Sequence, residues 1–506
     1  MITPAFMGMY TAQNAIMAAQ MALNTVNHNI SNANTEGFSR QRIELVQARA
    51  YTDPSLLGQT LSSGQVGMGV NVEGIERSRD AFLDGQFRYE SSRFNSNTTY
   101  NDALSQIDGI MGEPSDTGAN QAMQDFFASL QQLSINPQDL ATRQNVIQSA
   151  VSMVTVFQQQ AYQLQQLQYN LVGNPAQPAS IDASQLGVSV SNANNLLTGI
   201  ADLNRQILNI TAAGATPNDL LDKRDMMLDE LSEYVNIDVT HIENNQIQVR
   251  VANQLMIDGV TLEDTLQTTI NPGPAPDPNA QPVFVETVSG GVDIINTAAP
   301  NQLTAGKIRG LINVAGSDPY QTTVWGTITE LDTLLTTVID EVNTLHLAGR
   351  DITGTTPTDP LFEPNPVSAT GLNIFDIEVN ANVAANPNLI AAASGSGTFL
   401  GPGDGSNALD MAKLLNTAQA ALGGNTFAGE FNGIISKLGV DSNSILNRAE
   451  SQSGLMDQLL SRRESISGVN IDQEMVDMLR FQRAFEASSK ILSILNQLTD
   501  TIIGMV

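Results

Sequence analysis

Three histidines are the side chains of this 506-residue chain with the widest chemical use, and they lie far apart in the sequence. Their separation leaves no cluster of the kind that binds a metal or relays a proton. We interpret His28, His241 and His346 as solvated or structural residues. Cysteine is absent, which excludes disulfides, thiolate catalysis and thiolate-bound metals.

Other candidate sites lack the neighbouring sequence that their chemistry requires. Gly395-Ser396-Gly397 with Gly401 lacks the spacing and the preceding strand of a dinucleotide loop, and the Asp404-x-Ser406 loop lacks the acid pattern of a calcium loop. The charged run Asp222–Asp225 lies on an amphipathic pattern and predicts a salt-bridged helix face. Nucleophile elbows, phosphate loops and His-Glu-x-x-His motifs are missing. The sequence therefore predicts no enzyme, no bound metal and no cofactor.

The composition limits the partners of the chain. Asp and Glu number 52 against 23 Lys and Arg, a net charge of −29. Nucleic acid and anionic membranes are poor partners for such a chain, because phosphate binding needs clustered basic residues. No stretch approaches the roughly 18–20 apolar residues that span a bilayer. The first residues, Met1–Met7, do not form a cleavable signal peptide, so we expect a cytoplasmic chain or one exported without such a signal.

Both ends of the chain carry long heptad patterns. A helix predicted over residues 3–31 has large apolar residues every seven positions, with a mostly alanine row three further on. A helix predicted from Ile471 to Ile503 repeats the arrangement and adds a flanking apolar row. These rows are Met9, Ile16, Leu23 and Ile30 with Ala12, Ala19, Val26 and Ala33, then Met478, Phe485 and Leu492 with Phe481, Ser488, Leu495 and Ile502, and the flanking Ala484, Ile491, Leu498 and Met505.

Two terminal helices with apolar seams favour pairing of the chain ends as a coiled coil. The alternative is that each seam packs separately on a globular core. Between the ends, 3.6-residue periodicity predicts helices over 138–171, 193–210, 217–234 and 324–345.

Strand patterns cluster in the middle of the chain. Alternation around Ile237 and Ile247 with the turn Asn244-Asn245 predicts one hairpin, and segments 283–288 and 292–295 around Gly290-Gly291 predict another. The proline-rich stretch Pro272–Pro282 lies between them and is neither helix nor central strand. The irregular stretch 353–406 holds one expected strand, residues 375–379.

We therefore expect an α+β multidomain protein. Its terminal helices pair as a coiled coil, a long helical-bundle rod domain follows, and a β-rich outer domain is inserted in the middle of the chain. The expected divisions are a terminal coiled-coil axial domain (1–45 and 468–506), a helical-bundle rod domain (46–235, 310–350 and 405–467), a β-rich outer domain (236–309) and an irregular or β insert (351–404).

Two motifs at opposite ends of the chain carry a family resemblance. The run Asn29–Arg40, NISNANTEGFSR, resembles the N-terminal signature of the flagellar rod, hook and hook-associated proteins. Ser467–Glu474, SGVNIDQE, with Arg480–Ser488, RFQRAFEAS, resembles the matching C-terminal signature. Both motifs in one chain are specific, and the strong match covers about the first 80 and last 70 residues.

The segment Asn218–Asp225, NDLLDKRD, resembles one typical of the branch of this family that joins hook to filament, and the chain length fits that branch. The resemblance implies a structural subunit of the bacterial flagellum that assembles by its terminal helices at the hook–filament junction. The alternatives are another axial protein of the family, from hook or distal rod, or an acidic binding module with coiled-coil ends.

The resemblance also implies partners and a location. The partners would be identical subunits in a ring, hook protein, the next hook-associated protein on the filament side, and a cytoplasmic export chaperone at the C-terminal helix. The location would be the extracellular flagellum, reached by type III export without cleavage of a signal peptide. We expect the assembly interface to consist of Met9, Ile16, Leu23, Val26, Ile30, Asn32, Thr35, Gly37, Phe38, Met478, Phe481, Phe485, Ile491, Leu492, Leu495, Leu498 and Ile502.

Overall fold

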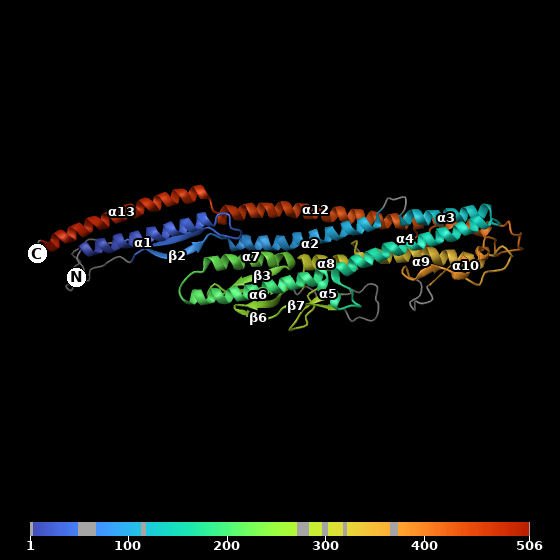
Figure 1. The fold of residues 1–506 in the computed structure, drawn as a ribbon, viewed down its shortest axis with the longest axis horizontal. Coiled ribbons are helices and arrows are strands. Elements are labelled where there is room, and N and C mark those ends of the chain that lie inside the picture. Colours follow the sequence, from blue (N-terminus) through green and yellow to red (C-terminus); the bar gives the residue numbers. More distant parts are fainter. Residues whose placement is uncertain are drawn as a thin grey trace. The chain divides into compact units, whose positions relative to one another are not determined.

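The structure is a computed structural model that describes residues 4–48, 67–112, 118–270, 283–295, 302–316, 321–364 and 373–504. It is mostly helical, with a few small antiparallel sheets (Figure 1). The chain divides into two compact units. Unit 1 contains residues 1–92, 193–265 and 452–506, and unit 2 contains residues 93–192 and 266–451.

Unit 1 holds both ends of the chain. Its complete elements are α1 (Pro4–Ser31), β1 (Gln41–Gln47), β2 (Val70–Arg77), α7 (Asn218–Tyr234), β3 (Ile237–His241), β4 (Ile247–Val251), β5 (Gln254–Asp258), β6 (Thr261–Leu262) and α13 (Ile471–Gly504). It also takes parts of α2 (Ala81–Met111), α6 (Gln185–Ala212) and α12 (Phe427–Ser467).

Two sheets stiffen unit 1. Strands β1 and β2 pair antiparallel, with a register shift between Glu44 and Leu45. Strands β3 to β6 form a four-stranded sheet in sequence order. The predicted hairpin of β3 and β4 is confirmed: Asn244 and Asn245 both have φ of 58°, the left-handed conformation that a tight hairpin turn requires and that asparagine tolerates.

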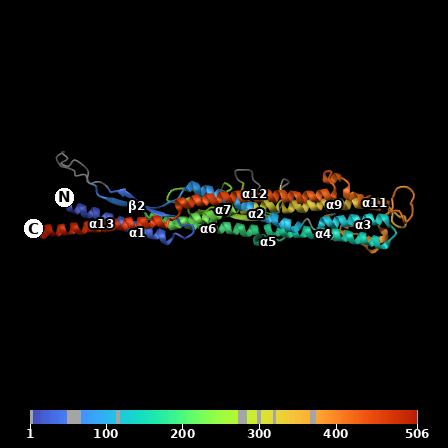
Figure 2. The same cartoon turned by 90° about the horizontal axis from the view of Figure 1, so that it is seen from above.

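Unit 2 is a helical bundle with small strands. Its elements are α3 (Ala119–Ile135), α4 (Leu140–Val172), α5 (Ala179–Ala183), β7 (Leu266–Ile270), β8 (Val283–Thr287), α8 (Lys307–Ala315), α9 (Val324–Ala348), β9 (Phe362–Pro364), β10 (Ile377–Val379), α10 (Ala381–Ala385) and α11 (Ser406–Lys413), with 3-10 turns at Pro387–Leu389, Leu414–Asn416 and Ala420–Leu422. Helix α3 packs on α4 and α11, and α4 packs on α9 (Figure 2).

Aromatic residues from distant segments form the centre of unit 2. Phe126 contacts Phe127 and Phe362, with ring centroids 5.3 and 5.7 Å away. Phe127 stacks on Phe427 at 5.8 Å, and all four side chains are buried. Because aromatic side chains bury large apolar areas, this cluster joins α3 to α12 and to the β9 strand.

The helices predicted at 138–171 and 324–345 agree closely with α4 and α9. The helix predicted at 193–210 lies within α6, which begins earlier, at Gln185. The run Thr216-Pro217-Asn218-Asp219 suggests that Thr216 caps α7, but Pro217 occupies the N-cap position and no side chain caps the helix there. Proline fixes the entry to the helix by its ring instead.

The second predicted hairpin is present in a short form. An isolated antiparallel bridge joins Glu286 to Asp293, and the Thr287 and Ile294 amides donate to the Val292 and Val285 carbonyls. Strand β8 also pairs with β7 over five residues, which the sequence did not predict. The expected strand at 375–379 is shorter, β10, and pairs with β9. The proline-rich stretch Pro272–Pro282 lies outside the described residues.

Candidate functional site

Helices α1 and α13 lie side by side and antiparallel (Figures 1 and 2). Near one end of the pair, Gly8 faces Leu495, and a side chain at Gly8 would come within 3.2 Å of Leu495 Cδ1. Near the other end, the side chain of Asn29 reaches Glu474. The opposite face of α1 packs on β1 and β2, so α1 lies between α13 and the β1–β2 sheet.

Small residues allow the close approach of α1 to its neighbours. The most buried positions of α1 follow a spacing of three and four residues, which defines one helix face. Alanine dominates this face, and a helix with alanine at its contacts packs close to its partner. The buried positions on this face are Ala12, Ala19, Ala22, Val26 and Asn29, and Asn14, Ala18 and Thr25 are buried on a neighbouring side of the helix.

Asn29 and Glu474 join the two ends of the chain. The Asn29 amide donates to the Gln41 carbonyl at 2.8 Å and to Glu474 Oε2 at 3.0 Å, and its Oδ1 accepts from Gln41 N at 3.0 Å. Arg40 Nε donates to Glu474 Oε1 at 2.6 Å, and Arg40 N donates to the Ser467 carbonyl at 2.8 Å. Asn29 and Glu474 are each 1 % exposed. The two motifs that carry the family resemblance are therefore in direct contact.

The turn after α1 places the rest of the first motif. Asn32 donates to the His28 carbonyl at 3.0 Å and accepts from Thr35 Oγ1 at 3.2 Å. Gly37 has φ of 76°, which favours glycine. The Phe38 ring meets the His28 ring edge-on at 5.3 Å. The motif thus ends α1 and turns the chain into β1.

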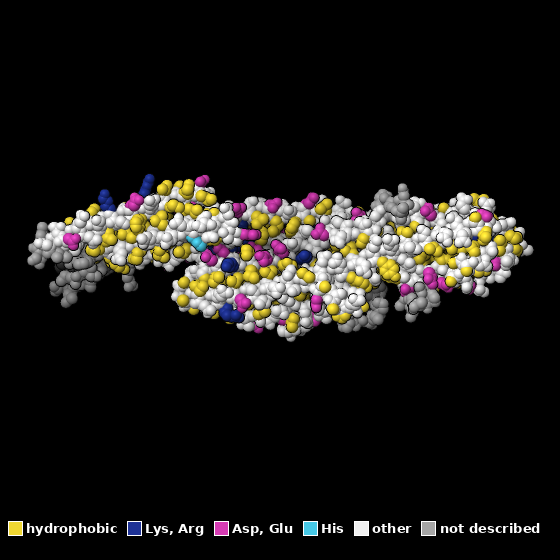
Figure 3. Space-filling view, in the orientation of Figure 1, with side chains coloured by type: hydrophobic (Ala, Val, Ile, Leu, Met, Phe, Trp, Pro, Cys, Tyr) yellow, Lys and Arg dark blue, Asp and Glu magenta, His cyan; other side chains and the backbone are white. Residues whose placement is uncertain are grey.

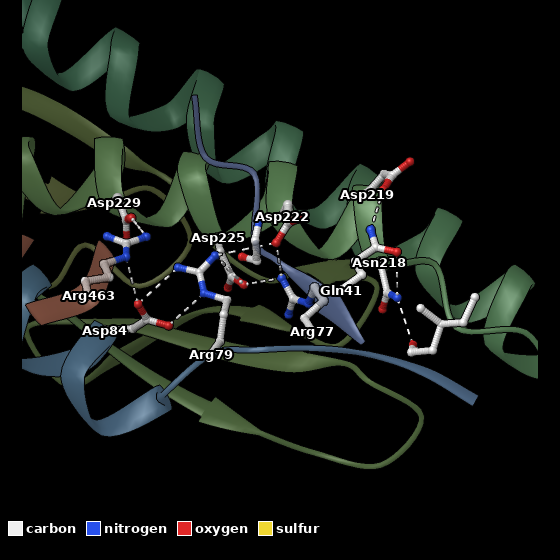
Figure 4. A network of polar contacts seen from close by, with 12 residues as sticks. Gln41, Arg77, Arg79, Asp84, Asn218, Asp219, Asp222, Asp225, Asp229 and Arg463 are labelled. Carbon is white, nitrogen blue, oxygen red and sulfur yellow. Dashed lines mark hydrogen bonds and ion pairs between the residues drawn. The ribbon is translucent and has the colours of Figure 1, made fainter. Parts of the chain in front are cut away.

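A buried ion cluster lies beside this turn (Figure 4). Arg77 Nη1 donates to Asp222 at 2.7 Å and to Asp225 at 2.8 Å. Arg79 pairs with Asp84 at 3.0 Å and with Asp225 at 3.2 Å. The cluster consists of Arg77, Arg79, Asp84, Arg88, Asp222, Asp225, Asp229 and Arg463.

The buried ion cluster ties α7 to three other segments. Arg88 of α2 and Arg463 of α12 bind Asp229 of α7 at 2.7 and 2.6 Å. Arg463 also reaches Asp84 at 3.1 Å. The motif loop joins the same helix, because the Ser39 amide donates to Asp222 at 3.0 Å. Asp222 and Asp225 are salt-bridged as predicted, but their partners are arginines of other segments and not neighbours on the same helix face.

The charges of this cluster compensate one another. Burial opposes ionisation of Asp225, but Arg79, Arg77 and Arg88 lower its pKa to about 2. Burial alone would lower the pKa of Arg79, yet Asp225 and Asp84 raise it above its usual range. Asp225 and Arg79 therefore keep their ionised forms because opposite charges surround them.

The expected assembly residues occupy two kinds of place. Most of the two seams is half-buried where α1 and α13 meet, and Val26 is buried. The flanking residues Ile491 and Leu498 are each 53 % exposed. The half-buried seam residues are Met9, Ile16, Leu23, Ile30, Met478, Phe481, Phe485, Leu492 and Leu495, and the side chain of Ile502 lies outside the described part.

The sequence analysis missed Asn29, Arg40 and Glu474 as contact residues and the arginines of the ion cluster altogether. A signal was present for Glu474, because a carboxylate on the heptad seam of α13 needs a buried partner. Asp222, Asp225 and Asp229 follow a spacing of three and four, the period of a buried face. Acidic residues on a buried face need basic partners, so this spacing indicated buried arginines.

No group of three or more His, Cys, Asp and Glu suited to a metal ion occurs among the residues that the structure describes. Within the same ranges, no helix combines the length and hydropathy needed to cross a lipid bilayer. The site is thus a helix pair made from the two chain ends, locked by a polar contact and placed beside a buried ion cluster. These features define a class of protein in which the N-terminal and C-terminal helices of one chain pair with each other.

Comparison with known proteins identifies the family. The model of the flagellar hook-associated protein FlgK helical domain matches residues 104–362, about half of the chain. Models of the flagella basal body rod protein and of the flagellar basal body rod FlgEFG protein C-terminal match residues 9–38 and 461–505. The chain belongs to the FlgK family of flagellar hook-associated proteins.

Similar proteins cover nearly the whole chain. Flagellar hook-associated protein 1 of Bacillus subtilis is 27 % identical over 99 % of both chains. The protein of the same name in Salmonella typhimurium is 26 % identical over 98 % of this chain and 99 % of its own. The flagellar hook junction protein FlgK from Burkholderia pseudomallei has a similar fold, with a TM-score of 0.61, 16 % identity and coverage of 76 % of this chain and all of that one.

Proposed function

We propose that this chain is a structural subunit of the bacterial flagellum that joins hook to filament, and that it enters the flagellum through α1 and α13. The observation that carries the proposal is the contact between the two terminal motifs through Asn29, Arg40 and Glu474. Its role is structural rather than catalytic.

The partners follow from this role. The chain contacts further copies of itself in a ring, hook protein on one side and the next hook-associated protein on the other. A cytoplasmic export chaperone binds α13 before export, because an amphipathic helix fits a hydrophobic groove. The protein then acts outside the cell, after type III export without a cleaved signal peptide.

The seam and motif residues expected at the assembly interface remain part of the proposal. Those at the contact of α1 and α13 build the terminal unit as a coiled coil, and those on its exposed faces meet other subunits. The four-part division into axial, rod, outer and insert segments is likewise proposed, with the axial part formed by residues 1–45 and 468–506.

Deletion of the gene from the source cells tests the function. The expected result is cells that retain hooks but lack attached filaments, with unassembled filament protein in the medium. Restoring the full chain should restore filaments, whereas a chain without residues 471–506 should not. Cells without hooks would instead assign the chain to the hook or rod, and unaltered filaments would refute the proposal.

A further inference from the structure

A cavity of about 820 Å³ lies in unit 1 between α1 and the start of α7. Its volume is within the range of ligand-binding pockets. One face of α1 forms the first side, with Met21, Asn24, Thr25 and His28 at a helical spacing of three and four positions. The turn before α7 and the first residues of that helix form the other side, and the β1–β2 sheet and the end of α6 complete the lining.

One buried polar atom at this cavity has no partner. Asn218 lines the cavity and is 7 % exposed, and no donor among the described residues reaches its Oδ1. Its amide nitrogen donates to the Ile75 carbonyl at 2.8 Å and to Gln41 Oε1 at 3.4 Å, and Gln41 donates to Asp219 at 3.0 Å (Figure 4). A buried carbonyl oxygen without a donor is unfavourable, so an N–H group brought by a ligand would stabilise this arrangement.

The other polar side chains of the cavity include both donors and acceptors. Asn24 is exposed and carries a carboxamide, and Asp219 lies 3.2 Å from His28. Figure 3 shows a histidine side chain (cyan) with acidic side chains beside it at the surface where α1 ends. Lys223 and Asp219 have opposite charges one helical turn apart, so with neutral histidine the cavity has no net charge. Such a lining suits an uncharged ligand with N–H and C=O groups, as in a peptide bond.

Apolar side chains lie among these polar groups. Met21 and Ile210 are 41 and 37 % exposed, and Ile75 and Leu220 are half-buried. Together they can cover the side chains of a bound segment, and methionine adapts its shape to what it contacts. An extended segment presents free N–H and C=O groups as well as side chains, whereas a helix uses its main-chain groups internally.

We propose that this cavity binds an extended, uncharged segment of a partner protein in the flagellum. The main chain of the segment donates an N–H group to Asn218 Oδ1 and bonds to the carboxamide of Asn24. Its side chains contact Met21, Ile210 and Leu220. This inference rests on the proposed function, because it places the partner in the same assembly.

Photo-cross-linking from the two sides of the cavity tests the proposal. The photoreactive residue p-benzoylphenylalanine replaces Met21 of α1 in one strain and Thr216 of the turn in another, since both are exposed and line the cavity. The unsubstituted chain is produced alongside, so that flagella still form. Isolated flagella are irradiated, and the attachment sites are mapped by mass spectrometry. The same residue at Asn27 is the control, because Asn27 is exposed on α1 outside the cavity.

Both cavity positions should attach to one segment of one protein, at sites within about six residues of each other, because an extended chain rises about 3.3 Å per residue. A helix rises only about 1.5 Å per residue, so sites further apart would overturn the inference. Attachment to a sugar or to two different proteins would do so too. An equal yield on the same segment from Asn27 would show contact outside the cavity and would also overturn it.

A matched pair of variants tests the hydrogen bonds. Asn24→Ala should lower the cross-linking yield from Thr216 about fivefold, as expected for the loss of one hydrogen bond to the segment. Asn27→Ala should leave the yield unchanged, because Asn27 is exposed on the same helix and does not line the cavity. Equal yields from the two variants would contradict the proposed contact with Asn24.

The same flagella separate this inference from the proposed function. If the unsubstituted chain is absent from them, the proposed function fails. If the photoreactive chains are present but form no product, the function stands and the binding site is refuted. If a photoreactive chain does not enter flagella, hydrogen exchange of the unsubstituted chain decides. Amides of residues 218–220 should exchange at least tenfold more slowly in isolated flagella than in the free chain, and unchanged rates would overturn the inference.

Discussion

Single residues decide how the two ends of this chain recognise each other. Asn29 uses both its amide donors and its oxygen in the contact with β1 and α13. Glu474 receives one of those donors and also Arg40. A carboxylate buried on an apolar seam is unfavourable unless it is paired, so this contact selects one alignment of α13 on α1.

Replacing Glu474 with glutamine should loosen the start of α13. Glu474→Gln removes the ion pair with Arg40, whose side chain is 27 % exposed and can regain water. We expect a loss of about 1–2 kcal/mol in local stability, seen as faster amide hydrogen exchange in the first turns of α13. The control is Glu486→Gln, at an exposed position of the same helix; equal exchange in the two variants would contradict the assigned role of Glu474.

His346 makes unit 2 sensitive to acid. It is fully buried, and burial lowers its pKa from 6.5 to about 4, with the backbone at Leu389 acting in the opposite direction. The unfolded state therefore binds a proton more readily than the folded state between these values. Above pH 6.5 the neutral, buried His346 contributes about 3 kcal/mol to the free energy of unfolding. This contribution is lost as the pH falls towards 4.

The variant His346→Leu should remove that contribution. Trp325, the single tryptophan, lies in α9 with His346 and reports unfolding of unit 2 by its fluorescence. Urea unfolding at pH 7 and pH 4 should show a smaller acid loss in the variant than in the unsubstituted chain. An identical loss in both proteins would place the acid sensitivity in other groups.

At the scale of elements, the sequence was most informative where one helix face is continuously apolar. The helix predicted from Ile471 to Ile503 ends one residue later in the structure, and the helix predicted at 324–345 starts with α9 and ends three residues before it. Strands β1 and β2 were missed because their charged residues, such as Glu44 and Glu73, obscure the alternation. β1 and β2 are separated in the sequence, and local periodicity does not reveal which distant segments pair.

The candidate site was predictable in part for the same reason. Seam residues follow from the heptad period, which is local. The contact of Asn29 with Glu474 joins residues 445 positions apart, and the ion cluster draws arginines from β2, α2 and α12 onto α7. Such partners are set by tertiary structure, so the sequence supplied the residue types but not their neighbours.

Helix α7 depends on the buried ion cluster, and Asp225 is its most heavily paired acid. Asp225→Asn keeps the size of the side chain but leaves Arg77 and Arg79 with less compensating charge while they stay buried. We expect unit 1 to lose about 3–5 kcal/mol, measured as lost amide protection in α7 and β2. Asp219→Asn is the control, since the Asp219 side chain is 64 % exposed on the same helix; a similar loss there would refute the assignment.

At the scale of the whole molecule, the terminal helices and the aromatic core of unit 2 belong to different units. Unit 1 holds both termini, while unit 2 is built from residues 93–192 and 266–451 around its own aromatic core. The terminal pair therefore joins the first and last segments of the chain without supplying residues to the core of unit 2. Because α1 and α13 are far apart in the sequence, their pairing is a non-local contact with a large loop-closure entropy cost.

Removing residues 471–506 tests this separation. The truncated chain should show the same urea midpoint by Trp325 fluorescence as the full chain, because unit 2 keeps its core. Amide exchange in α1 should accelerate, since the alanine face that approaches α13 becomes exposed. Removing only residues 499–506 is the matched control and should leave α1 protected, because the contacts at Leu495 and Glu474 remain. A large drop in the Trp325 midpoint after the longer truncation would mean that the two units fold as one, and unchanged exchange in α1 would mean that α13 does not cover it in solution.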